Sequence, residues 1–327
     1  MDNTPNVVVP TNTIPSVTVI GCGGCGINMV RRSLGNLRAC AKYRYIDTSY
    51  SNVQSGEEVI VVDGEGSGGV RAELAAKILK KVAAISSEDI HLADINIVVF
   101  SMSGGSGSVL APLLIREIKR RGKLVVAMAV ASSESLGHTD NLHKTLQSLE
   151  NDATKFDICL PISIFDNAVS GKTAVDMLMP TKLNELVDIL TLPTIELDKT
   201  DRLHWINVQK TIGAPAGLKI LWTGGEHNDV ELSVLDPDFI CDSVISIRSA
   251  TRSKPSVPKA RTLYEGMFVD PEVPEMLGGI GSPPGVFGKL LKHIEDVRVQ
   301  YQAQSLKKST VVDLSDAEID PESGLIL

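Results

Sequence analysis

A run of glycines and serines directly after an apolar segment constrains this chain more than any other feature. Residues 95–100 contain five β-favouring apolar side chains, which predicts a strand buried on both faces. The next loop contains only Gly and Ser from 103 to 108, and a helix is expected after it, with Pro112 in its first turn and Gly122 at its end. Such a loop lets backbone N–H groups converge on an anion, so it predicts a phosphate cradle, with an ordinary flexible turn as the alternative.

Two further loops of this kind occur in the first 70 residues. A predicted strand at 17–20 leads into Gly21-Cys22-Gly23-Gly24-Cys25-Gly26 and a helix. This run matches the dinucleotide pattern GxGxxG, and Asp47 follows at the distance expected of a ribose-binding acid, so an NAD-dependent oxidoreductase is one interpretation. A third cluster, at 64–69, lies between a predicted strand at 59–62 and a predicted helix at 70–84. Three loops around one sheet favour a mononucleotide held by several loops.

Cys22 and Cys25 form a CxxC pair, which could serve redox or metal chemistry. The sequence has five cysteines and no second CxxC, so this motif does not supply a complete metal site. Five cysteines in a long chain also do not indicate a disulfide framework, which favours a reducing compartment. We therefore expect small side chains beside a nucleotide here, and no metal-ligating residues.

Composition excludes several function classes. A chain of 327 residues that is 43% hydrophobic can bury a large core, and its length suggests two domains. A net charge of -8 argues against direct binding of nucleic acid, which needs a clustered positive surface. No apolar run reaches the roughly 18 residues that span a bilayer, and the Pro-, Asn- and Thr-rich start has no basic leader. We expect a cytoplasmic protein that does not bind membranes.

The order of elements predicts an α/β fold. Strands alternate with helices up to residue 171, which is typical of a parallel sheet that binds ligands at the carboxyl ends of its strands. An amphipathic helix follows at 172–192, and Pro180 either kinks it or starts it afresh. Mixed strands are then expected at 218–223, 230–235, 243–249 and 264–269, a flexible joint at 278–285, and a basic helix from 286 to about 308.

The predicted architecture is a parallel-sheet nucleotide-binding domain, joined by a central helix to a smaller α+β domain, with a long C-terminal helix and an extended acidic tail. The expected boundaries are a flexible extension at 1–16, the nucleotide-binding domain at 17–171, the central helix at 172–192, the smaller domain at 193–285, the C-terminal helix at 286–308 and the tail at 309–327.

Two acidic features lie outside the glycine loops. Asp198 and Asp201 are three residues apart where a loop enters a predicted helix, and spacing alone favours helix capping by Asp198 over catalysis. The segment 309–327 carries five acidic residues among apolar ones and no Lys or Arg. It is either a solubilising end or a docking peptide for a positive surface, such as the basic C-terminal helix of a neighbouring copy.

Together these features resemble the tubulin/FtsZ-type GTPases, and within them the phage-encoded tubulins of the PhuZ type. The resemblance covers nearly the whole chain and rests on the first nucleotide loop at 21–28, the signature loop at 104–108, the synergy-loop acids Asp198 and Asp201, and the acidic tail. The chain departs from the family in two places. The family's GGGTGTG is Ser-Gly-Gly-Ser-Gly-Ser-Val at 103–109, and Glu196 replaces the usual Asn two residues before Asp198.

The resemblance implies binding of GTP or GDP with Mg²⁺. The three glycine loops would hold the phosphates, Asp47 and Thr48 would form the second loop, Asn28 and Asn167 would lie near the guanine or ribose, and Glu134 would lie near the ribose. Asp176 would read the base, with Asn184 as a substitute because the Pro180 ring clashes with the Asp176 carbonyl in an unbroken helix. The implied phosphate-loop residues are Gly23, Gly24, Cys25, Gly66, Ser67, Gly68, Gly104, Gly105, Ser106, Gly107 and Ser108.

The resemblance also implies self-assembly. Asp198 and Asp201 would act on the nucleotide of the next subunit along a filament, so that hydrolysis requires assembly, and the tail at 309–327 would dock on a basic surface of the adjacent subunit. Such filaments would form a spindle that positions phage DNA and capsids in the host cytoplasm. An NAD-dependent oxidoreductase and a nucleotide-binding filament protein without turnover are the alternative functions.

Overall fold

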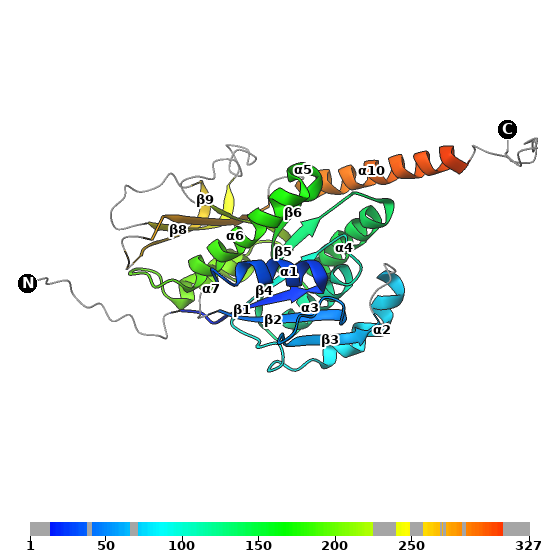
Figure 1. The fold of residues 1–327 in the computed structure, drawn as a ribbon. Helices are drawn as coiled ribbons and strands as arrows, with labels where there is room; N and C mark the ends of the chain where they lie inside the picture. The colour runs from blue at the N-terminus through cyan, green and yellow to red at the C-terminus, as the bar shows by residue number, and fades with distance from the viewer. Residues whose placement is uncertain are drawn as a thin grey trace, which may run out of the picture.

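The computed structural model describes residues 14–37, 41–65, 71–224, 240–248, 258–268, 270, 273–282 and 286–309. Within them, one ten-stranded sheet has the order β3-β2-β1-β4-β5-β6-β7-β10-β8-β9, with helices on both faces (Figure 1). This arrangement confirms the predicted α/β class. The strands are β1 Val17–Cys22, β2 Ala41–Ser49, β3 Val59–Gly64, β4 Ile95–Ser101, β5 Leu124–Ala131, β6 Cys159–Asp166, β7 Gly217–Gly224, β8 Cys241–Arg248, β9 Ala260–Met267 and β10 Met276–Gly281.

The sheet changes character along its width. All pairs from β3 to β7 are parallel, and β10 then pairs antiparallel with both β7 and β8. The strands that the sequence assigns to the smaller domain thus continue the same sheet through the β6–β7 pair. The predicted strand at 230–235 lies outside the described residues.

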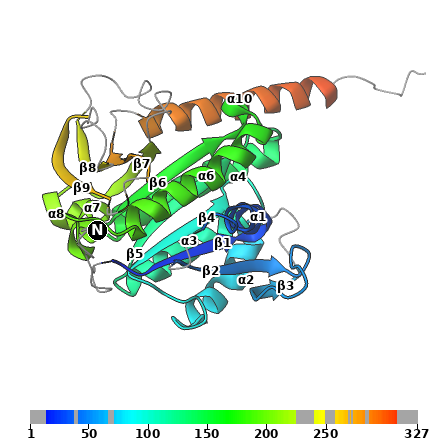
Figure 2. The same cartoon turned by 60° about the vertical axis from the view of Figure 1, so that its left-hand side comes forward.

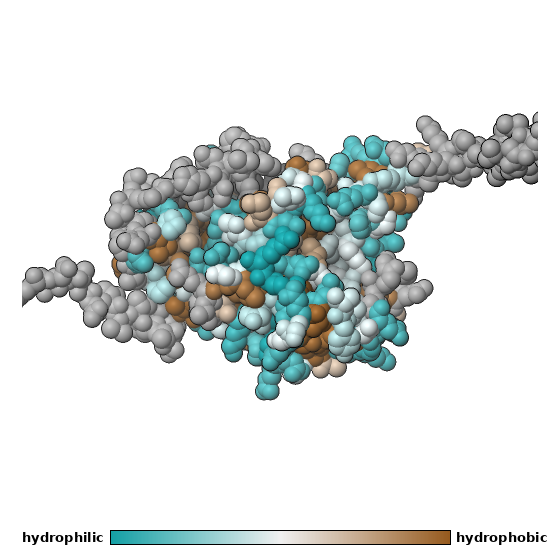
Figure 3. Space-filling view, viewed as in Figure 1, coloured by the Kyte–Doolittle hydropathy of each residue, from teal (hydrophilic) through white to brown (hydrophobic). Residues whose placement is uncertain are grey.

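Helices cover both faces of the sheet (Figure 2). One face carries α1 Gly23–Ser33, α6 Lys172–Thr191, α7 Lys199–Ile206 and α8 Val208–Ile212, and the short α5 Asn167–Ser170 connects β6 to α6. The other face carries α2 Arg71–Ala84, α3 Gly107–Arg120, α4 Leu136–Lys155 and α10 Val286–Ser309. Figure 3 shows hydrophilic residues gathered on the outer surface in the region of α1. Among the described residues, no helix combines the length and the apolar character needed to cross a bilayer.

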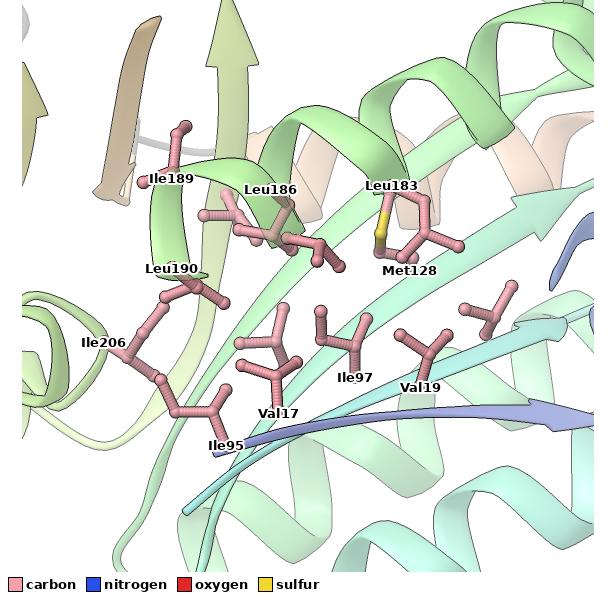
Figure 4. Close-up of a cluster of buried hydrophobic side chains, with 14 of the residues drawn as sticks. Val17, Val19, Ile95, Ile97, Met128, Leu183, Leu186, Ile189, Leu190 and Ile206 are labelled. Carbon is pink, nitrogen blue, oxygen red and sulfur yellow. The ribbon is translucent and has the colours of Figure 1, made fainter. Parts of the chain in front are cut away.

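Alternating side chains of the parallel strands build two cores, one on each face of the sheet. Val19 and Ile97 pack with Leu183 and Leu186 of α6, as Figure 4 shows. Ile20 and its neighbours on the opposite face pack against α2, α3 and α4. Both faces of β1 and β4 are therefore buried, which is why these strands are almost continuous apolar runs.

Pro112 lies deeper in its helix than its residue type suggests. We expected it in the first turn, but α3 begins at Gly107, because the small residues of the loop themselves form the first turn. Proline cannot donate to the carbonyl four residues earlier, which belongs to Ser108. That carbonyl instead accepts from Thr145 Oγ1 and Arg71 Nε, each at 3.3 Å. Two side chains from neighbouring helices thus satisfy the acceptor that the proline leaves free.

Pro180 is accommodated in the same way. The sequence left two possibilities open, a kink or a new helix start at Pro180. A new start is wrong, because α6 runs as one helix from Lys172 to Thr191. The carbonyl that Pro180 leaves without a donor is that of Asp176, and Arg32 Nη1 of α1 donates to it at 3.2 Å.

The prediction of a flexible joint at 278–285 is wrong for its first residues. Met276–Gly281 forms β10, a fully buried strand between β7 and β8. The glycines are required by packing. A Cβ atom on Gly278 would lie 2.7 Å from the Trp205 ring, and one on Gly279 would lie 2.3 Å from the Trp222 ring. Two large aromatic side chains therefore occupy the space that other residues would need.

Candidate nucleotide-binding site

The first nucleotide loop and the signature loop meet at the carboxyl ends of neighbouring strands. β1 and β4 are parallel and in register, so the loops that follow Cys22 and Ser101 leave the same edge of the sheet. Gly23 has a φ of +69°, and a Cβ atom placed on it would lie 2.7 Å from the backbone nitrogen of Gly107. The first nucleotide loop and the signature loop are therefore in backbone contact, and only glycine fits at position 23.

Two helix N-termini point into this region without a side-chain cap. Neither Cys22 before α1 nor Ser106 before α3 makes a capping hydrogen bond within the described residues. By contrast, Ser135 Oγ caps α4 by accepting from the backbone nitrogen of His138. Uncapped N–H groups and the positive ends of two helix dipoles form a site suited to an anion.

The carboxyl end of β2 joins this site through hydroxyl and carboxylate groups. Thr48 Oγ1 lies 2.6 Å from Ser106 Oγ, which connects the second loop to the signature loop. Asp47 is fully buried: its Oδ1 accepts from the Thr48 backbone nitrogen at 2.7 Å, and its Oδ2 accepts from Asn52 Nδ2 at 2.9 Å. The structure thus brings together Asp47, Thr48 and Ser106, which come from two separate segments of the sequence.

These oxygen groups fit the coordination chemistry of Mg²⁺. Magnesium prefers carboxylate, hydroxyl and water oxygens and is usually held by few protein ligands together with substrate phosphates. Thr48, Ser106 and Asp47 supply such oxygens beside the two uncapped helices. Bound there, the ion would neutralise phosphate charge.

Burial makes both cysteines of the CxxC pair poor nucleophiles. It raises the pKa of the fully buried Cys22 thiol strongly, and the nearby Asp47 raises it further. The pKa of Cys25 is raised to about 11, mainly by burial and then by Asp176. Neutral thiols are weak metal ligands and react slowly. The pair therefore behaves as two small apolar side chains in the wall of the site.

The start of α6 borders the site from the side of α1. Asp176 forms an ion pair with Arg32 in the last turn of α1, with 3.0 Å between Oδ2 and Nη1, and its charge also raises the pKa of Cys25 in the first nucleotide loop. Asn184 follows eight residues later, about 12 Å further along the helix. Its neighbour Leu183 packs beside Met128 in the middle of the sheet (Figure 4). The buried Asn184 Oδ1 has no hydrogen-bond partner among the described residues, so the choice between Asp176 and Asn184 for base recognition stays a prediction.

The two candidate asparagines have different surroundings. Asn28 Oδ1 accepts from Arg31 Nη1 at 2.6 Å, and Arg31 is in turn held by Glu57 at 2.7 Å. Asn167 starts α5 at the carboxyl end of β6, and its buried Oδ1 has no hydrogen-bond partner among the described residues. A buried acceptor of this kind is available to a ligand. The role of each asparagine in binding stays a prediction.

The other residues that the resemblance implies for nucleotide binding make few contacts that bear on this role. Glu134 is exposed in the loop before α4. In the signature loop, Gly104 donates its backbone N–H to Ser101 Oγ at 3.1 Å, and the Gly105 carbonyl accepts from Ser108 Oγ at 3.0 Å. Gly24 is packed against Asn52. Gly66, Ser67 and Gly68 of the third loop lie outside the described residues.

Sequence reasoning missed several residues that shape the site. Ser101 Oγ accepts from the backbone nitrogens of both Ser103 and Gly104 and so sets the turn of the signature loop. Asn52 holds the buried Asp47, and Arg71 reaches the Ser108 carbonyl from α2. The hydroxyl of Ser101 was discoverable as the last residue of a strand before a glycine loop. Nothing in the local sequence marks Asn52 or Arg71.

Asp198 and Asp201 do not join this site within their own chain. They form a reciprocal cap on α7: Asp198 Oδ1 accepts from the backbone nitrogens of Thr200 and Asp201, and Asp201 Oδ2 accepts from that of Asp198. Helix capping, which the spacing favoured, is therefore confirmed. Lys199 is paired with Asp94 just before β4, so the acids lie at the amino-terminal edge of the sheet. β4 has seven residues, which puts this edge about 20 Å from the glycine loops.

A buried arginine fixes the segment that carries these acids. Arg202 is fully buried and donates to the carbonyls of Ile189, Leu192 and Leu197 at 3.1, 2.7 and 3.1 Å. Burial lowers its pKa to about 10, so it stays charged at neutral pH. One side chain thus joins the end of α6, the following loop and α7 into a rigid unit.

Comparisons with known proteins agree with this geometry. The sequence model described as "Tubulin/FtsZ family, GTPase domain" matches residues 16–168. A phage tubulin-like protein of Pseudomonas phage PhiPA3 is 25% identical over 315 residues, which cover 91% of this chain and 95% of that protein.

Solved structures share the fold over almost the whole chain. The phage tubulin PhuZ with GDP has a TM-score of 0.78 at 21% identity, and a TubZ protofilament from bacteriophage PhiKZ has a TM-score of 0.77 at 21% identity. Each comparison covers 95% of this chain and 99% of the other. Residues 16–168 are therefore a GTPase domain of the tubulin/FtsZ family, in a chain that has the fold of the phage tubulins.

Proposed function

We propose that the chain is a self-assembling GTPase that hydrolyses GTP only between stacked copies. The observation that best supports this proposal is the distance between the two groups of residues within one chain. The glycine loops and the Asp198–Asp201 pair lie at opposite edges of the sheet, about 20 Å apart. A head-to-tail stack brings the carboxyl-terminal edge of one copy against the α7 edge of the next. The acids of one copy then face the nucleotide of its neighbour.

The two halves supply complementary chemistry. Phosphoryl transfer to water requires neutralisation of phosphate charge and a group that orients the attacking water. The uncapped starts of α1 and α3 provide fixed positive dipoles at the phosphates. In the acid pair, Asp198 Oδ2 and Asp201 Oδ1 take no part in the reciprocal cap, so they are available to accept from a water molecule. Neither half is sufficient alone.

The relatives support the filament and suggest its setting. A solved neighbour is a protofilament of a phage TubZ, and the similar proteins in the curated comparison are phage tubulin-like proteins. We extend this to the chain: its filaments form a spindle in the cytoplasm of an infected bacterium, where they position phage DNA and capsids. Its partners are further copies of itself, and the acidic tail at 309–327 docks on a basic surface of the adjacent subunit.

The dinucleotide interpretation has one structural point in its favour. The order β3-β2-β1-β4-β5-β6 is also that of dinucleotide-binding sheets. However, Thr48 and Ser106 bring loops from β2 and β4 to one point, which suits a mononucleotide held from several sides. A titration of NADH fluorescence separates the two: we expect no response, whereas saturable quenching that GTP cannot reverse would support an oxidoreductase.

Mixing two inactive variants tests the shared site. The first variant, Asp198→Asn with Asp201→Asn, retains an acceptor oxygen for each cap but loses the charges. The second, Gly23→Val, fills the space next to Gly107. With random order along a head-to-tail stack, about a quarter of the interfaces join an intact nucleotide site to intact acids.

We therefore expect each variant alone to release almost no phosphate and the mixture to recover part of the activity. Pelleting must show both variants in the polymer. If both are present and no activity returns, the shared-site proposal is contradicted.

A further inference from the structure

A series of hydrogen bonds joins the signature loop to α10, near the other end of the chain. Ser103, the first residue of the glycine-serine run, is buried, and its Oγ donates to the Ser132 carbonyl at 2.7 Å and accepts from the Ser132 backbone nitrogen at 2.8 Å. The Ser103 carbonyl accepts from Asn141 Nδ2 at 3.3 Å. The signature loop is therefore held by the loop after β5 and by α4.

α10 lies along α4 and binds the same two elements (Figure 1). Tyr301 Oη donates to the Ser133 carbonyl at 2.9 Å. Arg298 lies three residues earlier on the same side of the helix, with its Nε 2.9 Å from Asp140 Oδ1. Ser133 and Asp140 are the direct chain neighbours of the two residues that hold Ser103. One turn of α10 thus contacts the protein immediately behind the supports of the signature loop.

These two contacts lie beyond the apolar part of α10. Apolar side chains of residues 287–294 pack into the core on this face of the sheet, and Ile294 is 1% exposed. Arg298 and Tyr301 lie about one and two turns further along, where Val299 is 54% exposed. The attachment of this part of α10 therefore includes polar contacts near the surface, and such contacts open more readily than a packed core.

We propose that Tyr301 is a positioning residue for the nucleotide site, and that docking of α10 and binding of nucleotide strengthen each other. The inference rests on the proposed binding of nucleotide by the signature loop, and it does not require assembly. When the Tyr301 hydroxyl leaves the Ser133 carbonyl, the loop after β5 gains freedom and the hydrogen bonds that fix Ser103 loosen. Nucleotide binding must then order the signature loop again, which lowers the affinity. Because such coupling is reciprocal, bound nucleotide makes the opening of α10 less favourable.

Removal of one hydroxyl group tests the coupling in the unassembled chain. A fluorescent GDP analogue is titrated with the full-length chain below the concentration at which it scatters light, and its anisotropy is followed. We expect Tyr301→Phe to weaken binding about three- to tenfold, because the net contribution of one hydrogen bond is of this order. Asp140→Asn weakens the contact with Arg298, so it should act in the same direction, and it serves if Tyr301→Phe does not fold.

Matched controls separate this contact from a general effect of the substitutions. Tyr264→Phe in β9 also removes a tyrosine hydroxyl with a hydrogen-bond partner, Thr211, and should leave the affinity unchanged. Asp296→Asn makes the same charge change as Asp140→Asn, at an exposed position of α10, and should also bind as the unaltered chain does. If Tyr301→Phe binds the GDP analogue as tightly as Tyr264→Phe, the proposal is overturned.

Hydrogen–deuterium exchange distinguishes coupling from a merely structural role of Tyr301. Exchange of the α10 amides around Tyr301 is recorded with and without GDP, because it reports local opening of the helix. In the unaltered chain GDP should slow this exchange at least about threefold, as reciprocity requires, and in Tyr301→Phe most of this effect should be lost. Exchange that is the same with and without GDP in the unaltered chain contradicts the coupling.

The outcomes also separate this inference from the proposed function. If the unaltered chain binds GDP but neither effect appears, the coupling fails and the shared GTPase site stands. If the mixing experiment fails while both effects appear, the coupling stands without the shared site. If the unaltered chain binds neither GDP nor GTP, both are overturned.

Discussion

Lys199 Nζ lies 2.7 Å from Asp94 Oδ2, so the helix that carries the acid pair is joined to the residue directly before β4. Ser16, directly before β1, donates both its backbone nitrogen and its Oγ to the same carboxylate. Burial alone would raise the pKa of Asp94, but the hydrogen bonds from Lys199 and Ser16 outweigh it and lower the pKa to about 2. α7 is thereby held at the edge of the sheet that faces away from the glycine loops.

This carboxylate predicts a pH-dependent contribution to stability. The folded-state pKa of Asp94 is below its ordinary value of 3.8, so its ionised form stabilises the fold above about pH 4, and this contribution is lost as the pH falls towards 2. Asp94→Asn should lower the free energy of unfolding at pH 7, and the difference from the unaltered chain should shrink between pH 4 and pH 3. Urea unfolding at several pH values measures it; a difference that stays constant down to pH 3 would contradict the assignment.

Two substitutions at Asp201 separate its capping role from its charge. Asp201→Ala removes the acceptor for the Asp198 backbone N–H and should destabilise the chain by about 0.5–2 kcal/mol. Asp201→Asn can keep that acceptor, so it should unfold nearly as the unaltered chain does. Both should bind GTP normally, release phosphate slowly and form filaments that persist. Normal turnover in the Asn variant would show that the charge of Asp201 takes no part in hydrolysis.

Gly23→Ala should abolish nucleotide binding while the fold persists. The new Cβ atom would lie 2.7 Å from the Gly107 nitrogen at a φ of +69°, so the two loops must separate and the two helix N-termini would no longer converge. Gly137→Ala in the first turn of α4 meets no atom within 4 Å and is the matched control. Titration with a fluorescent GTP analogue measures the effect. Equal affinity in both variants would mean that the contact of the two loops does not form the cradle.

Arg202→Met should destabilise the chain more than a surface change. It leaves the carbonyls of Ile189, Leu192 and Leu197 without the donor that they have now, and unmet buried acceptors cost about 1–3 kcal/mol each. Arg202→Lys keeps the charge but cannot reach all three carbonyls, so its loss should be intermediate. The midpoint of urea unfolding ranks the three chains, and a Met variant as stable as the unaltered chain would contradict this account of the α6–α7 connection.

Sequence reasoning succeeded where structure is set locally. The apolar runs of β1 and β4, each followed by small residues, predicted strands, loops and helices that the structure confirms, and the spacing of Asp198 and Asp201 predicted a helix cap. A single residue type was misleading where its neighbours are distant. Gly278 and Gly279 suggest a flexible joint, but the rings of Trp205 and Trp222 pack against them in the folded chain. Pro112 suggests a helix start, but Thr145 and Arg71 donate to the carbonyl that it leaves without a donor.

In the candidate site, too, the features that depend on local sequence could be predicted, and those that depend on distant contacts could not. Backbone cradles are visible in sequence because they need runs of small residues, and Gly23 and Gly107 do meet. The pairing of Thr48 with Ser106, and the support of Asp47 by Asn52, depend on tertiary contacts that no local pattern encodes. The 20 Å separation of the two halves also emerges only from the sheet, because the sequence gives no strand register.

The rate of phosphate release per chain, measured with GTP across a range of protein concentrations, tests the central claim most directly. Light scattering recorded in the same samples marks the onset of assembly. If the acid pair must come from a neighbour, the rate per chain is near zero in dilute samples and rises at the concentration where scattering begins. A constant rate per chain, with full turnover in samples too dilute to scatter, would contradict the account.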